Sequence, residues 1–155
     1  MKQRIAFLFA TLGYVGKIPG APGSYASLLT TLALYTLYRT GFRILPELLV
    51  SVICLVTVLG VMAADEVCRM CGQEDPPFVV VDEVAGQLLT FLFLPVSGFH
   101  CVAGFLIFRA YDIWKPFPIR RLESLRHGVG IVADDLMAGL YANIAVRLVD
   151  LVAGR

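Results

Sequence analysis

The chain of 155 residues is long enough for one domain with its own core, and 58% of its residues are apolar while 16% are charged. Soluble domains average about 45–50% apolar residues, so this composition favours a membrane protein over a soluble one. The net charge of +1 supplies no strongly basic surface, but by itself it excludes neither a membrane nor a nucleic acid as partner. Because of the apolar composition we expect a lipid bilayer, and no nucleic acid, as partner. A single all-α domain over residues 1–155 is predicted, built as a multihelical, membrane-associated bundle.

The first quarter of the chain is predicted to hold two helices joined by a loop. Residues 5–12 form a short apolar helix, which we interpret as retained rather than as a cleaved signal. Residues 13–25 contain four glycines and two prolines and therefore form a structured loop. Ser24 or Ser27 can cap the helix that follows, which extends to about Tyr38.

An uncharged run over residues 48–64 is the best candidate for a membrane-spanning helix, because about 20 residues cross the hydrocarbon core. We expect it to end at Asp65. A polar stretch follows, and a further helix is predicted to begin near Asp82.

The next uncharged stretch, residues 88–108, is predicted to be a helical hairpin. Pro95 and Gly98 lie in its middle, where they favour a turn over a continuous helix. A hairpin over about residues 83–112 brings its outer ends together, whereas one long span would separate them. After Pro116 a basic connection leads to the last helix, predicted from Asp134 to about Val152.

Acidic pairs open two of these predicted apolar helices: Asp82 with Glu83, and Asp134 with Asp135. Four carboxylates that converge would repel one another, and Mg²⁺ is a suitable partner because it prefers oxygen ligands. The alternative is that each pair caps a helix N-terminus. In both segments a glycine follows the acid by four residues, at Gly86 and Gly139, and would let another helix approach closely.

Arg109, Asp112 and Lys115 follow one another at a spacing of three residues, so neighbouring members share a helix face. They form either a salt-bridge ladder or a phosphate site in which Asp112 is a base or a further ligand. The glycine-rich loop that contains Lys17 and Ser24 can present backbone N–H groups to phosphate, although it lacks the ending of a Walker loop. Cys68 and Cys71 have the spacing of a redox or zinc half-site, but no second pair accompanies them, and we interpret them as structural.

Four blocks of the sequence resemble the bacterial phosphatidylglycerophosphatase A family. They are P-x-APGS-x-x-SL at residues 19–28, DP-x-x-VVVDEVAG at 75–86, FR-x-YDIWKPFPIRR-x-E at 108–123 and G-x-GIVADDLMAG at 128–139. The resemblance implies an all-helical, Mg²⁺-dependent phosphatase that converts phosphatidylglycerophosphate to phosphatidylglycerol. It also implies an active site on the cytoplasmic side of the bacterial inner membrane.

On this basis we expect one or two Mg²⁺ ions to be held by Asp82, Glu83, Asp134 and Asp135. The catalytic residues are predicted to be Arg109, Asp112 and Lys115, and the substrate-binding residues to be Arg120, Lys17 and Ser24. Water attacks the phosphate, or an aspartate does so first. Two alternatives remain open at this point: a non-enzymatic membrane protein that binds a cation or an anionic lipid, and a soluble helical phosphatase of a small phosphate ester. Asp65 and Asp75 are expected to support the structure or the metal ligands.

Overall fold

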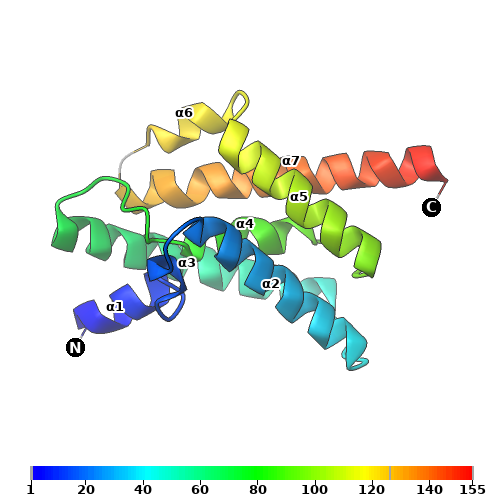
Figure 1. Cartoon of the computed structure of the whole chain (residues 1–155), viewed down its shortest axis with the longest axis horizontal. Helices are drawn as coiled ribbons and strands as arrows, with labels where there is room; N and C mark the ends of the chain where they lie inside the picture. Colours follow the sequence, from blue (N-terminus) through cyan, green and yellow to red (C-terminus); the bar gives the residue numbers. More distant parts are fainter. Residues whose placement is uncertain (1, 126, 155) are drawn as a thin grey trace.

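The computed structural model describes residues 2–125 and 127–154, and within these residues it contains helices and no strand. This confirms the predicted all-α fold (Figure 1). The elements in chain order are α1 (Lys2–Ala10), the 3-10 helix η1 (Val15–Lys17), α2 (Pro22–Arg39), α3 (Pro46–Cys71), α4 (Val81–Thr90), α5 (Gly98–Trp114), α6 (Ile119–Glu123) and α7 (His127–Ala153).

The short helix α4 lies at the centre of the bundle. It packs most extensively on α7 and also contacts α3 and α2. The long helices α3 and α7 run along the longest axis of the molecule, and α2 and α5 cross them obliquely (Figure 1). Among the fully buried side chains are Phe91, which follows α4, and Phe108 on α5. The position of α4 matters for function because its first turn carries Asp82 and Glu83.

The predicted hairpin is confirmed, with arms formed by α4 and α5. Helix α4 ends at Thr90, and α5 begins at Gly98 after Ser97, whose side chain accepts a hydrogen bond from the backbone N–H of His100. The second arm has 17 residues and is longer than expected, because it continues without a break to Trp114.

Two helix boundaries in the first half differ from the prediction. Helix α2 begins at Pro22, whose fixed φ suits a first helical position, so neither Ser24 nor Ser27 is its cap. The Ser27 hydroxyl instead donates to the carbonyl oxygen of Gly23 at 2.8 Å, inside the helix. Helix α3 does not end at Asp65 but continues to Cys71, where Gly72 terminates it in a left-handed conformation.

Helix α7 begins at His127, seven residues before the predicted start at Asp134. Its first turn lies against α3, and a Cβ at Gly128 would collide with the carbonyl oxygen of Val61. Asp65 of α3 accepts a hydrogen bond from the Gly128 N–H at 3.0 Å, which satisfies one free donor of the α7 N-terminus. Asp134 and Asp135 therefore lie inside a helix, and capping does not explain this acidic pair.

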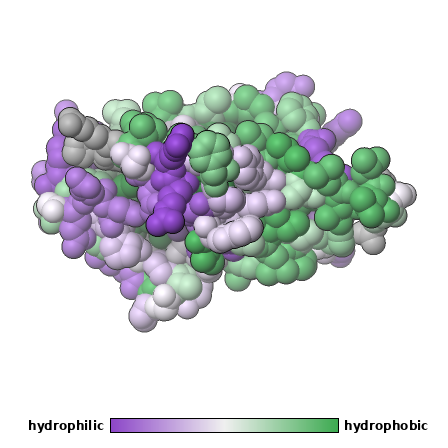
Figure 2. All heavy atoms as spheres, turned by 90° about the horizontal axis from the view of Figure 1, so that it is seen from above, coloured by the Kyte–Doolittle hydropathy of each residue, from purple (hydrophilic) through white to green (hydrophobic). Residues whose placement is uncertain are grey.

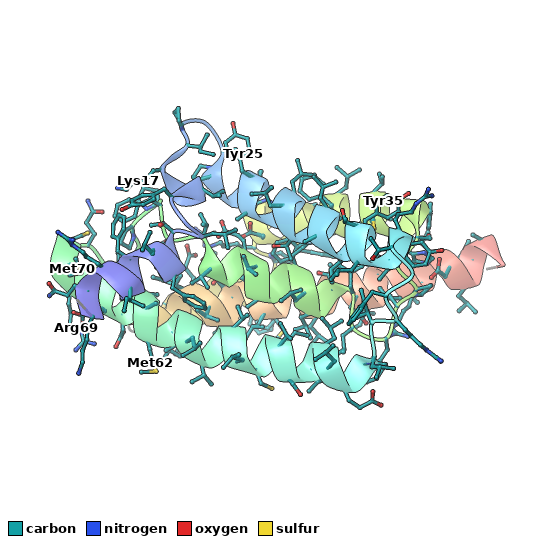
Figure 3. All side chains as sticks on the ribbon, turned by 90° about the horizontal axis from the view of Figure 1, so that it is seen from below. Lys17, Tyr25, Tyr35, Met62, Arg69 and Met70 are labelled. Atoms are coloured by element: carbon teal, nitrogen blue, oxygen red, sulfur yellow. The ribbon has the colours of Figure 1, made fainter. Side chains whose placement is uncertain are left out.

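Two helices, α3 and Gly128–Ala153 within α7, are long and apolar enough to cross a membrane. Only 28% of the most apolar window in each is buried, whereas a helix in the core of a soluble protein would be mostly buried. Met62 of α3, for example, is 63% exposed and points away from the bundle (Figure 3). Apolar side chains cover one half of the molecule, while hydrophilic side chains gather toward the other end (Figure 2).

Candidate metal and phosphate site

Three carboxylates from α4 and α7 meet at the centre of the bundle. Asp82, Glu83 and Asp135 each offer an oxygen, and these oxygens lie within 4.8 Å of one another. Asp82 and Asp135 are 9% and 3% exposed. One buried oxygen of each of the three residues has no hydrogen-bond partner among the described residues. Buried carboxylates that lack partners are unfavourable, and a divalent cation with a preference for oxygen fits this group.

Close contact between two helices creates this meeting point. A Cβ at Gly86 would collide with the carbonyl oxygen of Asp135, and a Cβ at Gly139 would collide with that of Gly86. The two glycines therefore mark the crossing of α4 and α7, as their spacing from the acids predicted. Because each glycine follows its aspartate by one helical turn, the crossing holds Asp82 and Asp135 next to each other.

The first turn of α2 also reaches the site, through Gly23, to which the sequence analysis assigned no role. A Cβ at Gly23 would collide with Oε1 of Glu83 and would lie 3.1 Å from Nη1 of Arg109. Lys17 lies elsewhere, with its Nζ 3.4 Å from the ring centroid of Phe78 (Figure 3). Ser24 does not line the acidic cavity, as far as the described residues define it.

Arg109 connects the acidic group to α5. Its Nη1 lies 2.5 Å from Oδ2 of Asp112 and 3.7 Å from Oε1 of Glu83. The ion pair between Arg109 and Asp112, one of the two interpretations of this spacing, is therefore present along α5. Arg109 also lies beside Glu83, as the predicted hairpin requires. The guanidinium is thus held between two carboxylates, with its Nε buried and without a hydrogen-bond partner in the described part of the chain.

Lys115 separates Asp134 from the group of three carboxylates. Its Nζ donates to Oδ2 of Asp134 at 2.7 Å and to Oε1 of Glu123 at 2.8 Å. The other oxygen of Asp134 accepts from the N–H of Asp135 at 3.0 Å. Lys115 ends α5 in a left-handed conformation (φ 46°), which directs the chain into the turn before α6. Sequence reasoning did not assign a role to Glu123, although it is the last residue of the 108–123 block.

These residues surround a cavity of about 640 Å³. Asp75 lines the cavity, so it faces the site, whereas Asp65 serves the α7 N-terminus. Arg120 does not line the acidic cavity but a separate, open hollow beside it. Among the described residues, the acidic cavity is lined by Glu74, Asp75, Pro77, Val79, Asp82, Glu83, Asp112, Lys115, Glu123, Ser124, Leu125, Ile131, Asp134 and Asp135.

Burial controls the protonation of this site. Desolvation, together with the charge of Glu83, raises the pKa of Asp82 well above its usual range. Desolvation also raises the pKa of Glu83 to about 7, although Asp82 and Arg109 act in the opposite direction. Burial alone would lower the pKa of Lys115, but its hydrogen bonds to Asp134 and Glu123 outweigh this and raise it. Lys115 therefore stays protonated beside carboxyl groups whose raised pKa favours the protonated form.

The cysteine pair lies outside this site. Cys68 is buried and donates to the carbonyl oxygen of Glu74 at 3.2 Å, and Cys71 is exposed at the end of α3. Both are free thiols. Cys68 thus fixes the segment that leads to Asp75.

Comparison with known proteins places the chain among bacterial lipid phosphatases. The model of the family described as Phosphatidylglycerophosphatase A matches residues 8–150. A protein of Escherichia coli K12 named phosphatidylglycerophosphatase A is 36% identical over 126 residues, which cover 79% of this chain and 69% of that protein. Its namesake in Haemophilus influenzae is 35% identical over 134 residues, covering 84% and 80%. A Bacteroides thetaiotaomicron protein named putative phosphatidylinositol-3-phosphatase is 34% identical over 143 residues, covering 90% and 89%. No solved structure matches the chain significantly.

Proposed function

Because the chain belongs to the phosphatidylglycerophosphatase A family, we propose that it is a Mg²⁺-dependent phosphatase that removes the terminal phosphate of phosphatidylglycerophosphate and leaves phosphatidylglycerol. The observation that carries this proposal is the meeting of Asp82, Glu83 and Asp135 in a cavity that Lys115 also lines, with Nη1 of Arg109 3.7 Å from Oε1 of Glu83. Such a site offers ligands for a metal and donors for a phosphate in the same space.

Asp82, Glu83 and Asp135 would hold Mg²⁺, which supplies a Lewis acid for the phosphoryl group and makes a bound water more acidic. Their partnerless buried oxygens support this assignment. Asp134 was predicted to be a fourth ligand. Its ion pair with Lys115 supports a different role, in which Asp134 positions the lysine.

Arg109 and Lys115 would bind the oxygens of the phosphate, where negative charge must be stabilised during transfer. Arg109 is suited to this because Asp112 orients its guanidinium while its buried Nε has no partner among described residues. Asp112 lines the same cavity and would take the proton of the attacking water. Attack by an aspartate, with a phospho-aspartyl intermediate, is the alternative course.

The name of the Bacteroides relative favours a second candidate, a phosphatidylinositol phosphate. Both substrates carry a phosphate monoester on a phospholipid headgroup, so the same metal and cations would serve either. They differ in the size of the group next to the phosphate. Phosphate release from the two lipids, measured in the same mixed micelles, separates the candidates.

We place the protein in the bacterial inner membrane, with the acidic cavity on the cytoplasmic side. There it would catalyse a step of phospholipid biosynthesis. Two helices suited to membrane crossing and the basic residues Lys115, Arg120 and Arg121 near the cavity support this orientation. Arg39, at the C-terminal end of α2, and Arg43, just beyond it, fall on the opposite side of the membrane under simple alternation of the spans. These two residues do not follow the tendency of basic residues to lie on the cytoplasmic side.

The test is release of inorganic phosphate from phosphatidylglycerophosphate by purified protein, with Mg²⁺ or with EDTA. We expect release that requires Mg²⁺ and that falls at least about a hundredfold in Asp135→Asn, which keeps the shape of the side chain but removes its charge. Asp150→Asn is the matched control, because Asp150 pairs with His100 at 3.0 Å and does not line the cavity. A folded wild-type protein that releases no phosphate with any divalent ion would favour the non-enzymatic alternative.

A further inference from the structure

The turn between α5 and α6 exposes large apolar side chains next to the acidic cavity. Trp114 is 78% exposed, Phe117 is 70% exposed and Ile113 is 71% exposed. Exposing two aromatic rings and a large aliphatic side chain to water at one turn is unfavourable. Trp in particular is enriched where a protein meets the interface of a membrane, because its ring is apolar while its N–H can stay hydrated.

The same segment carries positive charge that has no ion-pair partner among the described residues. Arg120 and Arg121 are both exposed on α6. The guanidinium of Arg121 lies 4.8 Å from the ring centroid of Phe117, so charge and aromatic surface belong to one feature. An open hollow of about 580 Å³ is lined, among the described residues, by Trp114, Lys115, Pro116, Phe117, Arg120 and Arg121, with no carboxylate.

Lys115 links this hollow to the acidic cavity, since it lines both. The two spaces nevertheless suit different ligands. The acidic cavity contains carboxylates and suits a cation with a phosphate, whereas the hollow offers arginines and aromatic rings and suits an anion attached to apolar chains. A molecule held in the hollow would therefore lie beside the reaction site without occupying it.

We propose that Trp114, Phe117, Arg120 and Arg121 form a docking site for anionic phospholipids of the bilayer. The rings lie at the level of the headgroups, and the arginines bind the phosphodiester of a lipid with net negative charge. Charge complementarity selects anionic over zwitterionic lipids, because the latter carry a compensating cation. This docking site deepens the proposed function, because it holds the mouth of the acidic cavity at the membrane surface that contains the lipid substrate. It rests on the proposed function only for the role of that neighbouring cavity.

Trp114 is the single tryptophan of the chain, so its fluorescence reports on this site alone. The protein is reconstituted into vesicles of phosphatidylcholine and phosphatidylglycerol in which one of the two lipids is brominated, at equal mole fraction. We expect brominated phosphatidylglycerol to quench Trp114 at least about twofold more than brominated phosphatidylcholine, because basic residues enrich anionic lipids around them.

In the double variant Arg120→Gln/Arg121→Gln the ratio of the two quenching efficiencies should fall to about one. The matched control is Arg39→Gln/Arg43→Gln, which removes the same charge at the far end of α2 and should keep the preference (Figure 1). Both arginine pairs are exposed, so circular dichroism should show the same helix content in both variants.

Three results would overturn the proposal: equal quenching by both lipids in the wild type, a preference that survives loss of Arg120 and Arg121, or no quenching by either lipid. Asp135→Asn separates this proposal from the phosphatase. That variant should lose phosphate release while its lipid preference stays that of the wild type. A preference that disappears together with catalysis in Asp135→Asn would place the lipid in the acidic cavity instead.

Discussion

Asp134 and Asp135 are neighbours in the chain but have different surroundings. Successive residues of a helix point about 100° apart, so Asp134 and Asp135 are directed to different neighbours. Asp135 joins Asp82 and Glu83, whereas Asp134 turns to Lys115 at 2.7 Å.

The two aspartates should therefore respond differently to removal of their charge. Asp135→Asn should weaken binding of Mn²⁺, used as a magnetic probe for Mg²⁺, by more than about a hundredfold, because it removes a ligand. Asp134→Asn should weaken it by no more than about tenfold, as expected for a group that acts through a neighbour. Titration by electron paramagnetic resonance measures both. Equal losses would return Asp134 to the ligand set that the sequence suggested.

We expect Glu83 to make metal binding dependent on pH. Burial raises its pKa to about 7 from an ordinary 4.5, so below pH 7 the metal must displace a proton. Because this pKa is raised, protonated Glu83 stabilises the metal-free fold at low pH, and this stabilisation is lost as the pH rises through about 7. The affinity for the metal increases over the same range. We expect Mg²⁺ affinity about tenfold lower at pH 6 than at pH 8, measured by calorimetry. In Glu83→Gln the affinity should be low throughout and this part of the slope should vanish.

Single residues of the site were predictable to different degrees. Carboxylates in an apolar chain are conspicuous, which is why Asp82, Glu83, Asp134 and Asp135 could be singled out together, whereas the sequence did not separate Asp134 from the other three. The pairing of Glu123 with Lys115 depends on the direction of the turn between α5 and α6, which the sequence around Pro116 does not specify. Gly23 has no side chain to suggest a role, and its importance appears only when Glu83 and Arg109 are placed against it.

At the scale of elements, the crossing of α4 and α7 is the contact on which the site depends. Thr90 of α4 strengthens it, since its hydroxyl donates to the carbonyl oxygen of Gly139 of α7 at 3.5 Å. Asn143 of α7 donates to the carbonyl oxygens of Thr90 and Leu92 at 2.8 Å each, which ties α7 to the C-terminal end of α4. The crossing is thus held by the close contact at Gly86 and Gly139 and by hydrogen bonds at the C-terminal end of α4.

Gly139→Ala should separate the two helices, because its Cβ would collide with the backbone of α4 rather than with a flexible side chain. We expect a loss of about 1–3 kcal/mol in the free energy of unfolding. Phosphate release should fall further than this loss of stability explains, since Asp82 and Asp135 move apart. Gly98→Ala is the control, because a Cβ there meets nothing within 4 Å. The two variants are compared by thermal denaturation and by phosphate release, measured on the same preparations. A Gly139→Ala variant as stable and as active as the Gly98→Ala control would show that the helices can adjust to the added methyl group.

The hairpin could be predicted from Pro95 and Gly98, whereas the start of α7 could not. Glycines at positions 128 and 130 are typical of a loop when only local preferences are considered. In the structure Gly128 lets α7 pack against the backbone of α3, and that tertiary contact outweighs the low helix propensity of glycine. Helix α3 was likewise predicted to end too early, because its charged last two turns resemble a polar connection.

At the scale of the whole molecule, polar and apolar surfaces are segregated. Hydrophilic side chains gather toward one end, and apolar side chains cover the other half (Figure 2). Large exposed apolar side chains lie on α2, α3, α5 and α7. The composition predicted a membrane protein, and this exposed apolar half is consistent with that prediction.

We therefore expect the protein to remain with membranes after a wash with high salt and with alkaline carbonate, because burial of apolar surface rather than charge holds it there. Sedimentation of membranes followed by immunoblotting checks this. Release by high salt would favour the soluble phosphatase, in which the apolar surface of α3 would have to be covered by another chain.

The crossing of α4 and α7 joins residues that the ribosome makes far apart in time. When Asp82 and Glu83 have emerged, Asp135 has not yet been synthesised, and the Gly86 side of α4 has no helix to pack on. A nascent or truncated chain that lacks α7 thus contains two of the three carboxylates and no closed site. Because Asp135 joins the cluster only when α7 packs on α4, we expect chains that lack α7 to have no phosphatase activity.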